Sequence, residues 1–200
     1  MNPDQMNIKD HYPDSFNDKS EWFELYGDVK EHIPKNLPRA LGKGAEVTAW
    51  VDADYSGDKL TRHSHTGLLI FVNSAPIFWY SKLQATIESS TFGSEVVSLR
   101  TCLELIKYLQ YELRMTGLTI LRPDHVWGDN KGVVNSASIP ETRITKKHLG
   151  IFYHAFREVS EQGIWKVGFC KVVNNIADCL TNILSGSAKD KQVSKWMYRK

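Results

Sequence analysis

The stretch "VTAWVDADYSGD", residues 47–58, contains one of the clearest strand patterns in the chain. Its apolar residues alternate with Thr48 and Trp50, as expected of a strand with one buried face. The end of this strand places Asp52 and Asp54 on the same face, because side chains alternate along a strand. Since an unpaired buried charge is strongly disfavoured, these two acids must either reach water or hold a cation.

The composition is that of an ordinary globular protein. The 200 residues are 42% apolar and 24% charged with a formal net charge of +2, which argues against a disordered chain and against a histone-like binder. Three cysteines without CxxC spacing are expected to be buried free thiols in a reducing compartment. The sequence has no secretion signal and no apolar run that could span a bilayer. We therefore expect a soluble intracellular protein, cytoplasmic or nuclear, with no membrane partner.

The chain divides into three parts. Residues 1–45 are charged and contain prolines that disfavour helix, which indicates an N-terminal arm or linker. Residues 46–184 carry the strand and helix patterns and are expected to form the folded domain. Residues 185–200 are expected to form a basic C-terminal tail.

Strand and helix patterns follow one another in a definite order within the expected domain. The first three strands are predicted at 46–54, 66–73 and 75–81, and their short connections indicate antiparallel hairpins. The elements predicted after them are a helix at 91–115, a strand at 125–130, a short helix at 131–138, a helix at 145–161, a strand at 164–172 and a helix at 174–184.

Four acids stand at comparable places in these elements. They are Asp52 at the end of the first strand, Glu95 on the apolar face of the long helix, Asp129 at the end of the fourth strand, and Asp178 early in the last helix. Adjacent parallel strands bring their carboxyl ends to one sheet edge, where ligands bind in open α/β sheets. Converging carboxylates repel each other, and Mg²⁺ ions relieve that repulsion because they prefer oxygen ligands. Two such ions about 4 Å apart promote in-line phosphoryl displacement.

Taken singly, each acid has an ordinary explanation. Asp52 could be a turn former, and Glu95 could be an acid stabilised by the helix dipole. Asp129 could cap the next helix, and Asp178 could be a solvated helix residue. We interpret Asp54 as solvated or as a group that supports a ligand from outside.

Two further groups of polar residues remain open. His63 and His65 have a spacing that suits a metal on a strand, but "TRHSHTG" is more typical of a loop with polar side chains. Lys146, Lys147 and His148 form a small basic patch that could contact backbone phosphates. A solvated helix start explains this patch equally well.

Five stretches of the chain occur in the order of a known family: "VDADYSGDKLTRHSHTG", "APIFWYSKLQATIESSTFGSE", "VWGDNKGVV", "TKKHLGIFYHAFRE" and "NIADCLTNIL". Over about residues 47–184 the chain closely resembles the ribonuclease H domain of copia-type retrotransposon polyproteins. The resemblance implies a mixed α/β fold, with a five-stranded mixed sheet whose first three strands are antiparallel and with flanking helices. The family's quartet of metal-binding catalytic acids falls on Asp52, Glu95, Asp129 and Asp178.

The resemblance also implies substrate, cofactor and partners. The substrate is an RNA/DNA hybrid whose RNA strand is hydrolysed with two Mg²⁺ ions, for which Mn²⁺ is a substitute. The 2′-hydroxyls distinguish RNA from DNA, and Asn130 is a candidate for that contact. Lys146, Lys147 and His148 are candidates for nucleic-acid contacts, and a reverse transcriptase domain of the parent polyprotein is a candidate partner.

Two departures from related enzymes keep other functions open. Many cellular ribonucleases H have a His-bearing loop before the last catalytic Asp, whereas "KVVNNIAD" is short and contains no His. The chain also lacks the Tyr-x-Asp-Asp pattern of a polymerase palm. The first alternative to the nuclease is an inactive remnant that binds nucleic acid or is purely structural. A receiver-like Mg²⁺-binding α/β domain is less consistent, because that class alternates strand and helix from the start.

Overall fold

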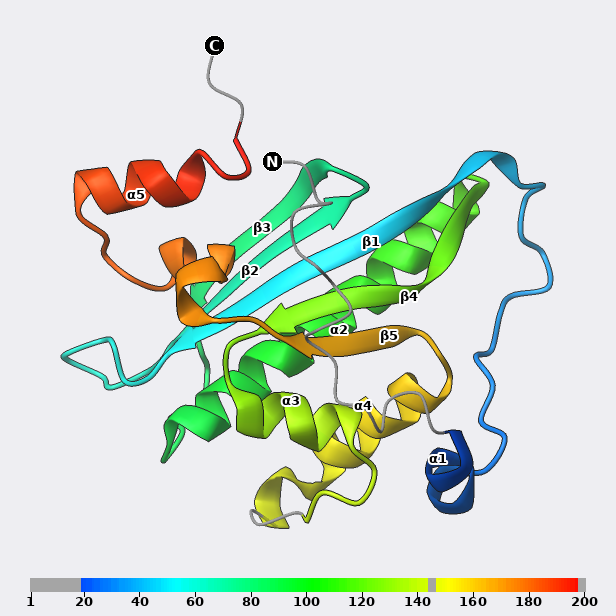
Figure 1. Ribbon diagram of the computed structural model, residues 1–200, viewed down its shortest axis with the longest axis horizontal. Coiled ribbons are helices and arrows are strands. Elements are labelled where there is room, and N and C mark those ends of the chain that lie inside the picture. Colours follow the sequence, from blue (N-terminus) through cyan, green and yellow to red (C-terminus); the bar gives the residue numbers. More distant parts are fainter. Residues whose placement is uncertain (1–18, 144–146, 198–200) are drawn as a thin grey trace.

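The computed structural model describes residues 19–143 and 147–197 (Figure 1). Its five strands form one sheet in the order β3-β2-β1-β4-β5. The strands are β1 (Leu41–Asp54), β2 (His65–Val72), β3 (Ala75–Leu83), β4 (Leu118–Gly128) and β5 (Trp165–Phe169). The first three pair antiparallel, whereas β4 pairs in parallel with both β1 and β5. The predicted mixed α/β fold with a five-stranded mixed sheet is therefore confirmed.

Helices cover both faces of this sheet. The α-helices are α1 (Lys19–Tyr26), α2 (Thr91–Met115), α3 (Lys131–Ser138), α4 (Gly150–Glu161) and α5 (Gly186–Val193). Three short 3₁₀ helices are η4 (Lys147–Leu149), η5 (Val172–Asn174) and η6 (Ile176–Leu180). Helices α2, α3 and α4 share one apolar core with the strands, while η6 lies on the other face against β1 and β2 (Figure 1).

The alternation in β1 explains why two faces are covered. Val47, Ala49 and Val51 are buried on the face that packs against α2, as the strand pattern predicts. Trp50 points to the opposite face, where its ring meets the edge of Phe71 with ring centroids 5.2 Å apart. The apolar residues of this second face are joined by η6 and the C-terminal segment.

The part predicted as an N-terminal arm or linker contains a helix, α1. Helix α1 packs on α4 and buries Trp22, and the Tyr26 hydroxyl lies 3.0 Å from Nδ1 of His154. Glu31 and Arg114 form a two-pronged ion pair with nitrogen–oxygen distances of 2.7 and 3.1 Å. The local apolar pattern of "EWFELY" favours helix α1, whereas the proline-containing residues 27–40 form no helix or strand. The division into arm, domain and tail stays a prediction.

Several predicted boundaries also differ. Strand β4 begins at Leu118 instead of 125, because Gly117 adopts a positive φ of 83° and turns the chain directly out of α2. Helix α4 begins at Gly150 instead of 145, after the 3₁₀ turn η4, and residues 145 and 146 lie outside the described part. The helix predicted at 174–184 is instead the two 3₁₀ turns η5 and η6, which are separated by Asn175.

The expectation of buried free thiols is met in part. Cys102 and Cys170 are buried free thiols, whereas Cys179 is only half-buried. Within residues 19–143 and 147–197, none of the helices combines the length and the apolar character needed to cross a bilayer.

Candidate active site

Three of the four predicted acids meet at one end of the sheet. Asp52 lies near the end of β1, and the parallel pairing of β1 with β4 brings Asp129 beside it at the end of β4. Glu95 joins them from the first turns of α2, which packs on β1. One carboxylate oxygen from each residue lies within 4.8 Å of the others.

Asp52 is held by residues that follow β5. Its Oδ1 accepts a hydrogen bond from Nδ2 of Asn175 at 3.3 Å, and its Oδ2 accepts one from the Thr181 hydroxyl. The same Asn175 amide donates to the backbone carbonyl of Val51 at 3.0 Å. These contacts leave only 5% of Asp52 exposed and fix the direction of its carboxylate.

The pKa values of all three acids are raised, and burial is the largest cause for each of them. Burial raises the pKa of Asp52 to about 7, the hydrogen bond from Thr181 opposes this, and the charge of Asp129 adds to it. The pKa of Glu95 rises well above its usual range through burial first, then through the charges of Asp52 and Asp129. Burial also raises the pKa of Asp129, against a hydrogen bond from Asn175. The metal-free cluster therefore retains protons that a bound cation would displace.

The chemistry of this donor set fits a divalent cation. All three groups offer carboxylate oxygens, the ligands that Mg²⁺ and Mn²⁺ prefer. Two of the three residues are buried, so water cannot screen their charges. A cation held by Asp52, Glu95 and Asp129 would offset both burial and repulsion.

Asp178 lies beside this trio but has different partners. Its charge contributes to the raised pKa values of Asp52 and Asp129, so it lies within electrostatic reach of both. Its Oδ1 accepts a hydrogen bond from Nδ2 of Asn182 at 2.7 Å, and its Oδ2 accepts one from Nε2 of Gln192 at 3.0 Å. In the described ranges, the group with oxygens within 4.8 Å of one another contains the other three acids and not Asp178.

Asp54 and the two histidines are engaged in the hairpin between β1 and β2. Asp54 accepts a hydrogen bond from the backbone N–H of His65, and its Oδ2 lies 3.6 Å from the ring of that residue. A Cβ at position 57 would come within 1.5 Å of Asp54 Oδ2, so any other residue there would force the Asp54 carboxylate to move. His63 Nδ1 lies 2.6 Å from the carbonyl oxygen of Gln84. These contacts give the three side chains structural tasks in the hairpin.

The predicted nucleic-acid contacts lie on two elements. Asn130 caps α3, because its Oδ1 accepts two backbone N–H groups of the first turn at 3.1 and 3.3 Å. Lys147 and His148 lie in η4, and both are exposed. Lys146 lies outside the described residues.

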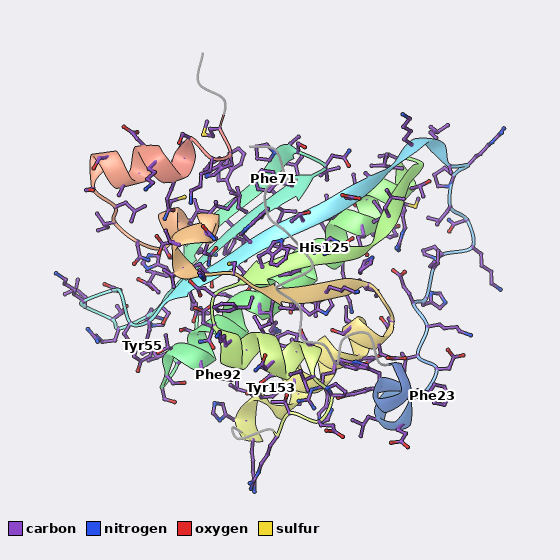
Figure 2. All side chains as sticks on the ribbon, in the orientation of Figure 1. Phe23, Tyr55, Phe71, Phe92, His125 and Tyr153 are labelled. Atoms are coloured by element: carbon purple, nitrogen blue, oxygen red, sulfur yellow. The ribbon has the colours of Figure 1, made fainter. Side chains whose placement is uncertain are left out.

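Helix α4, which follows these exposed residues, packs beside the start of α2. The rings of Phe92 and Tyr153 stack with centroids 6.0 Å apart, and Figure 2 labels both on neighbouring elements. The guanidinium of Arg100 lies 4.7 Å from the centre of the Phe152 ring. The exposed basic residues of η4 therefore directly precede the helix that packs beside α2, which carries Glu95.

Four side chains that donate hydrogen bonds to the acids were not predicted: Asn175, Thr181, Asn182 and Gln192. Asn175 was expected only as part of the predicted helix at 174–184, although its position three residues before Asp178 in "NNIAD" offers a local indication. The closeness of Thr181 to Asp178, three residues earlier in the sequence, offers the same kind of local indication. Gln192 has none, because it lies in the segment assigned to a separate tail.

The fold is that of ribonuclease H-like domains. The structure superimposes on the N-terminal RNase H domain of a Mycobacterium tuberculosis protein with a TM-score of 0.53 and 16% identity, covering 76% of this chain and 99% of that one. LC11-RNase H1 in complex with an RNA/DNA hybrid also gives a TM-score of 0.53, with 14% identity and coverage of 74% and 99%. At this level of identity the likeness establishes the fold alone.

The sequence is similar to parts of retrotransposon polyproteins. The chain is 29% identical over 154 residues to the retrovirus-related Pol polyprotein from transposon RE1 of Arabidopsis thaliana. The matched region covers 77% of this chain and 10% of that polyprotein. The chain is 27% identical over 143 residues to the corresponding polyprotein from transposon TNT 1-94 of Nicotiana tabacum, covering 72% and 11%. The chain thus spans about a tenth of the length of the curated relatives it matches. No family model matches the sequence. The resemblance to copia-type transposon polyproteins is confirmed.

Proposed function

We propose that this protein is a metal-dependent endonuclease that hydrolyses the RNA strand of RNA/DNA hybrids. The observation that carries the proposal is the convergence of Asp52, Glu95 and Asp129 at the end of a ribonuclease H-like sheet. The structural neighbour LC11-RNase H1 is bound to an RNA/DNA hybrid, which supports the choice of substrate.

The acids would hold divalent cations, with Mg²⁺ as the natural ion and Mn²⁺ as a substitute. Asp52, Glu95 and Asp129 supply the first oxygens, and Asp178 is the fourth carboxylate of the proposed site. When bound, two such cations activate the attacking water and stabilise the leaving oxygen of an in-line displacement. Asn175 would keep the Asp52 carboxylate directed at the site by its hydrogen bond. Because a water molecule is the nucleophile, the mechanism requires no Ser, Cys or His triad.

The substrate contacts of the proposal come from exposed polar groups. Lys146, Lys147 and His148 would contact backbone phosphates, which position a duplex without reading its sequence. The side-chain N–H₂ of Asn130 would donate to a 2′-hydroxyl, since its Oδ1 is used in capping α3.

The cellular setting belongs to the same proposal. We place the protein in an intracellular compartment, which the three free cysteines support. Its partner would be the reverse transcriptase domain of a longer polyprotein, as the length of the relatives suggests.

The decisive experiment measures cleavage of an RNA/DNA hybrid labelled on the RNA strand. The full chain should cleave it in Mg²⁺ or Mn²⁺, not in a chelator, and should leave duplex DNA intact. Asp129→Asn keeps the shape of the side chain but removes a charge, and should lower the rate at least about a hundredfold. The control Asp28→Asn changes an exposed acid paired with Lys30 and should keep full activity. A wild-type protein that binds the hybrid without cleaving it would favour the inactive remnant instead.

A further inference from the structure

The C-terminal helix α5 reaches the fourth acid of the proposed site. Gln192, in the last turn of α5, donates a hydrogen bond from Nε2 to Asp178 Oδ2 at 3.0 Å. The amide must have this orientation, because the reverse one would set its oxygen against a carboxylate oxygen. Among the described residues, the Gln192 Oε1 is buried without a hydrogen-bond partner. The contact with Asp178 therefore accounts for where this amide is placed.

The residues that follow Gln192 anchor its segment to the domain at two places. Trp196 packs against the apolar cluster of Leu69, Phe71 and Ile176 on the second face of the sheet. Lys195 donates from Nζ to the carbonyl oxygen of Val173 at 2.9 Å. These contacts hold α5 against the turn on which Asp178 lies.

Asp178 lies on a short turn, where local contacts hold only one of its two carboxylate oxygens. Asp178 lies in the 3₁₀ helix η6, whose hydrogen-bond geometry is poorer than that of an α-helix. Its backbone N–H donates to the carbonyl of Asn175 at a long 3.4 Å. Asn182 holds one carboxylate oxygen from the same local segment, so the other depends on the contact from α5.

We propose that Gln192 is a positioning residue, which orients the Asp178 carboxylate toward the cation site of Asp52, Glu95 and Asp129. This inference rests on the proposed function. It makes helix α5 a part of the proposed cation site. Each Asp178 oxygen has a second lone pair, so the hydrogen bonds from Asn182 and Gln192 leave room for a cation. Hydrogen bonds of this kind fix the direction of a ligating carboxylate, and their loss costs about 10-fold to 100-fold in metal affinity or activity.

The test is Mn²⁺ binding to the full chain, measured by the electron paramagnetic resonance signal of free Mn²⁺. We expect Gln192→Ala to weaken binding about tenfold and Asp178→Asn to weaken it at least as much. The double variant should bind no more weakly than Asp178→Asn alone, because Gln192 acts only through Asp178. A purely structural role would make the two losses add. Gln192→Met, which keeps the length of the stem but cannot donate, should match Gln192→Ala and serves if the smaller residue unfolds the helix.

The control is Gln162→Ala, which removes an amide beside Glu158 at the end of α4 and should leave Mn²⁺ affinity unchanged. Unchanged or tighter binding by both Gln192 variants would overturn the inference, and tighter binding would identify α5 as a latch that withholds Asp178. Additive losses in the double variant would overturn it as well. A wild-type chain that binds no Mn²⁺ would overturn the proposed function, and this inference with it.

Discussion

Replacing Asp52 by Asn should stabilise the metal-free protein at neutral and alkaline pH but not at acid pH. Burial raises the pKa of this carboxyl from 3.8 to about 7. The folded protein therefore keeps a proton that the unfolded chain releases, and wild-type stability falls as pH rises from 3.8 to about 7. A shift of about three units at 1.36 kcal/mol per unit sets an upper limit of about 4 kcal/mol.

The hydrogen bonds around residue 52 allow the substitution with little rearrangement. The Asn oxygen can accept from Asn175, as Asp52 Oδ1 does. Its N–H₂ can donate to the Thr181 hydroxyl, whose own proton then turns to the carbonyl oxygen of Asp178 at 3.1 Å. Because neutral hydrogen bonds are weaker than charged ones, we expect a gain of about 1–3 kcal/mol at pH 8 and almost none at pH 4.

The assay is urea unfolding of both proteins in a chelator at several pH values between 4 and 8. Addition of Mg²⁺ should stabilise the wild type at pH 8, because a ligand that binds only the folded state raises its stability, and should have a smaller effect on the variant. Asp28→Asn is the control for a general effect of charge. A stability difference between wild type and Asp52→Asn that stays constant from pH 4 to pH 8 would refute the reasoning.

Three further substitutions test other parts of the structure. Gly57→Ala should lower the free energy of unfolding by about 1–3 kcal/mol, because the new Cβ would collide with Asp54, and urea unfolding measures this. Trp22→Ala removes a side chain that is 3% exposed and should release α1 from α4, which limited proteolysis detects as faster cleavage near the N-terminus; an unchanged digest would contradict the packing of α1. Lys147→Ala should weaken hybrid binding about equally for all sequences, and the magnitude of the slope of log affinity against log salt concentration should fall by about one in a binding titration. A loss confined to one sequence would argue for base contacts instead.

The sequence predicts best those parts of the fold that local patterns determine. The alternation in β1 and the apolar stripe of α2 set the orientation of the central strand and the long helix, so the expected approach of Asp52 and Glu95 agrees with the structure. Asp129 follows from the same logic, because it directly follows a strand parallel to β1.

The unpredicted features depend on contacts between distant residues. The segment after β5 forms 3₁₀ turns instead of an α-helix where the Asn175 side chain binds the backbone of β1, 124 residues away. The hydrogen bond between Gln192 and Asp178 joins the predicted C-terminal tail, residues 185–200, to the predicted domain, residues 46–184. Whether residues 1–45 and 185–200 act as an arm and a tail stays a prediction.

The separation of these contacts along the chain has a consequence for synthesis and folding. Asp52 lies in the first third of the chain, but its partner Asn175 is 123 residues later and its partner Thr181 is 129 residues later. Contacts of such long range form late, because closing a long loop costs entropy before any contact compensates for it. A nascent chain that has not reached residue 175 can pair β1 with β2 but has no group to satisfy the Asp52 carboxylate. The order of translation therefore delays the assembled acidic centre until Asn175 and Thr181 have emerged from the ribosome.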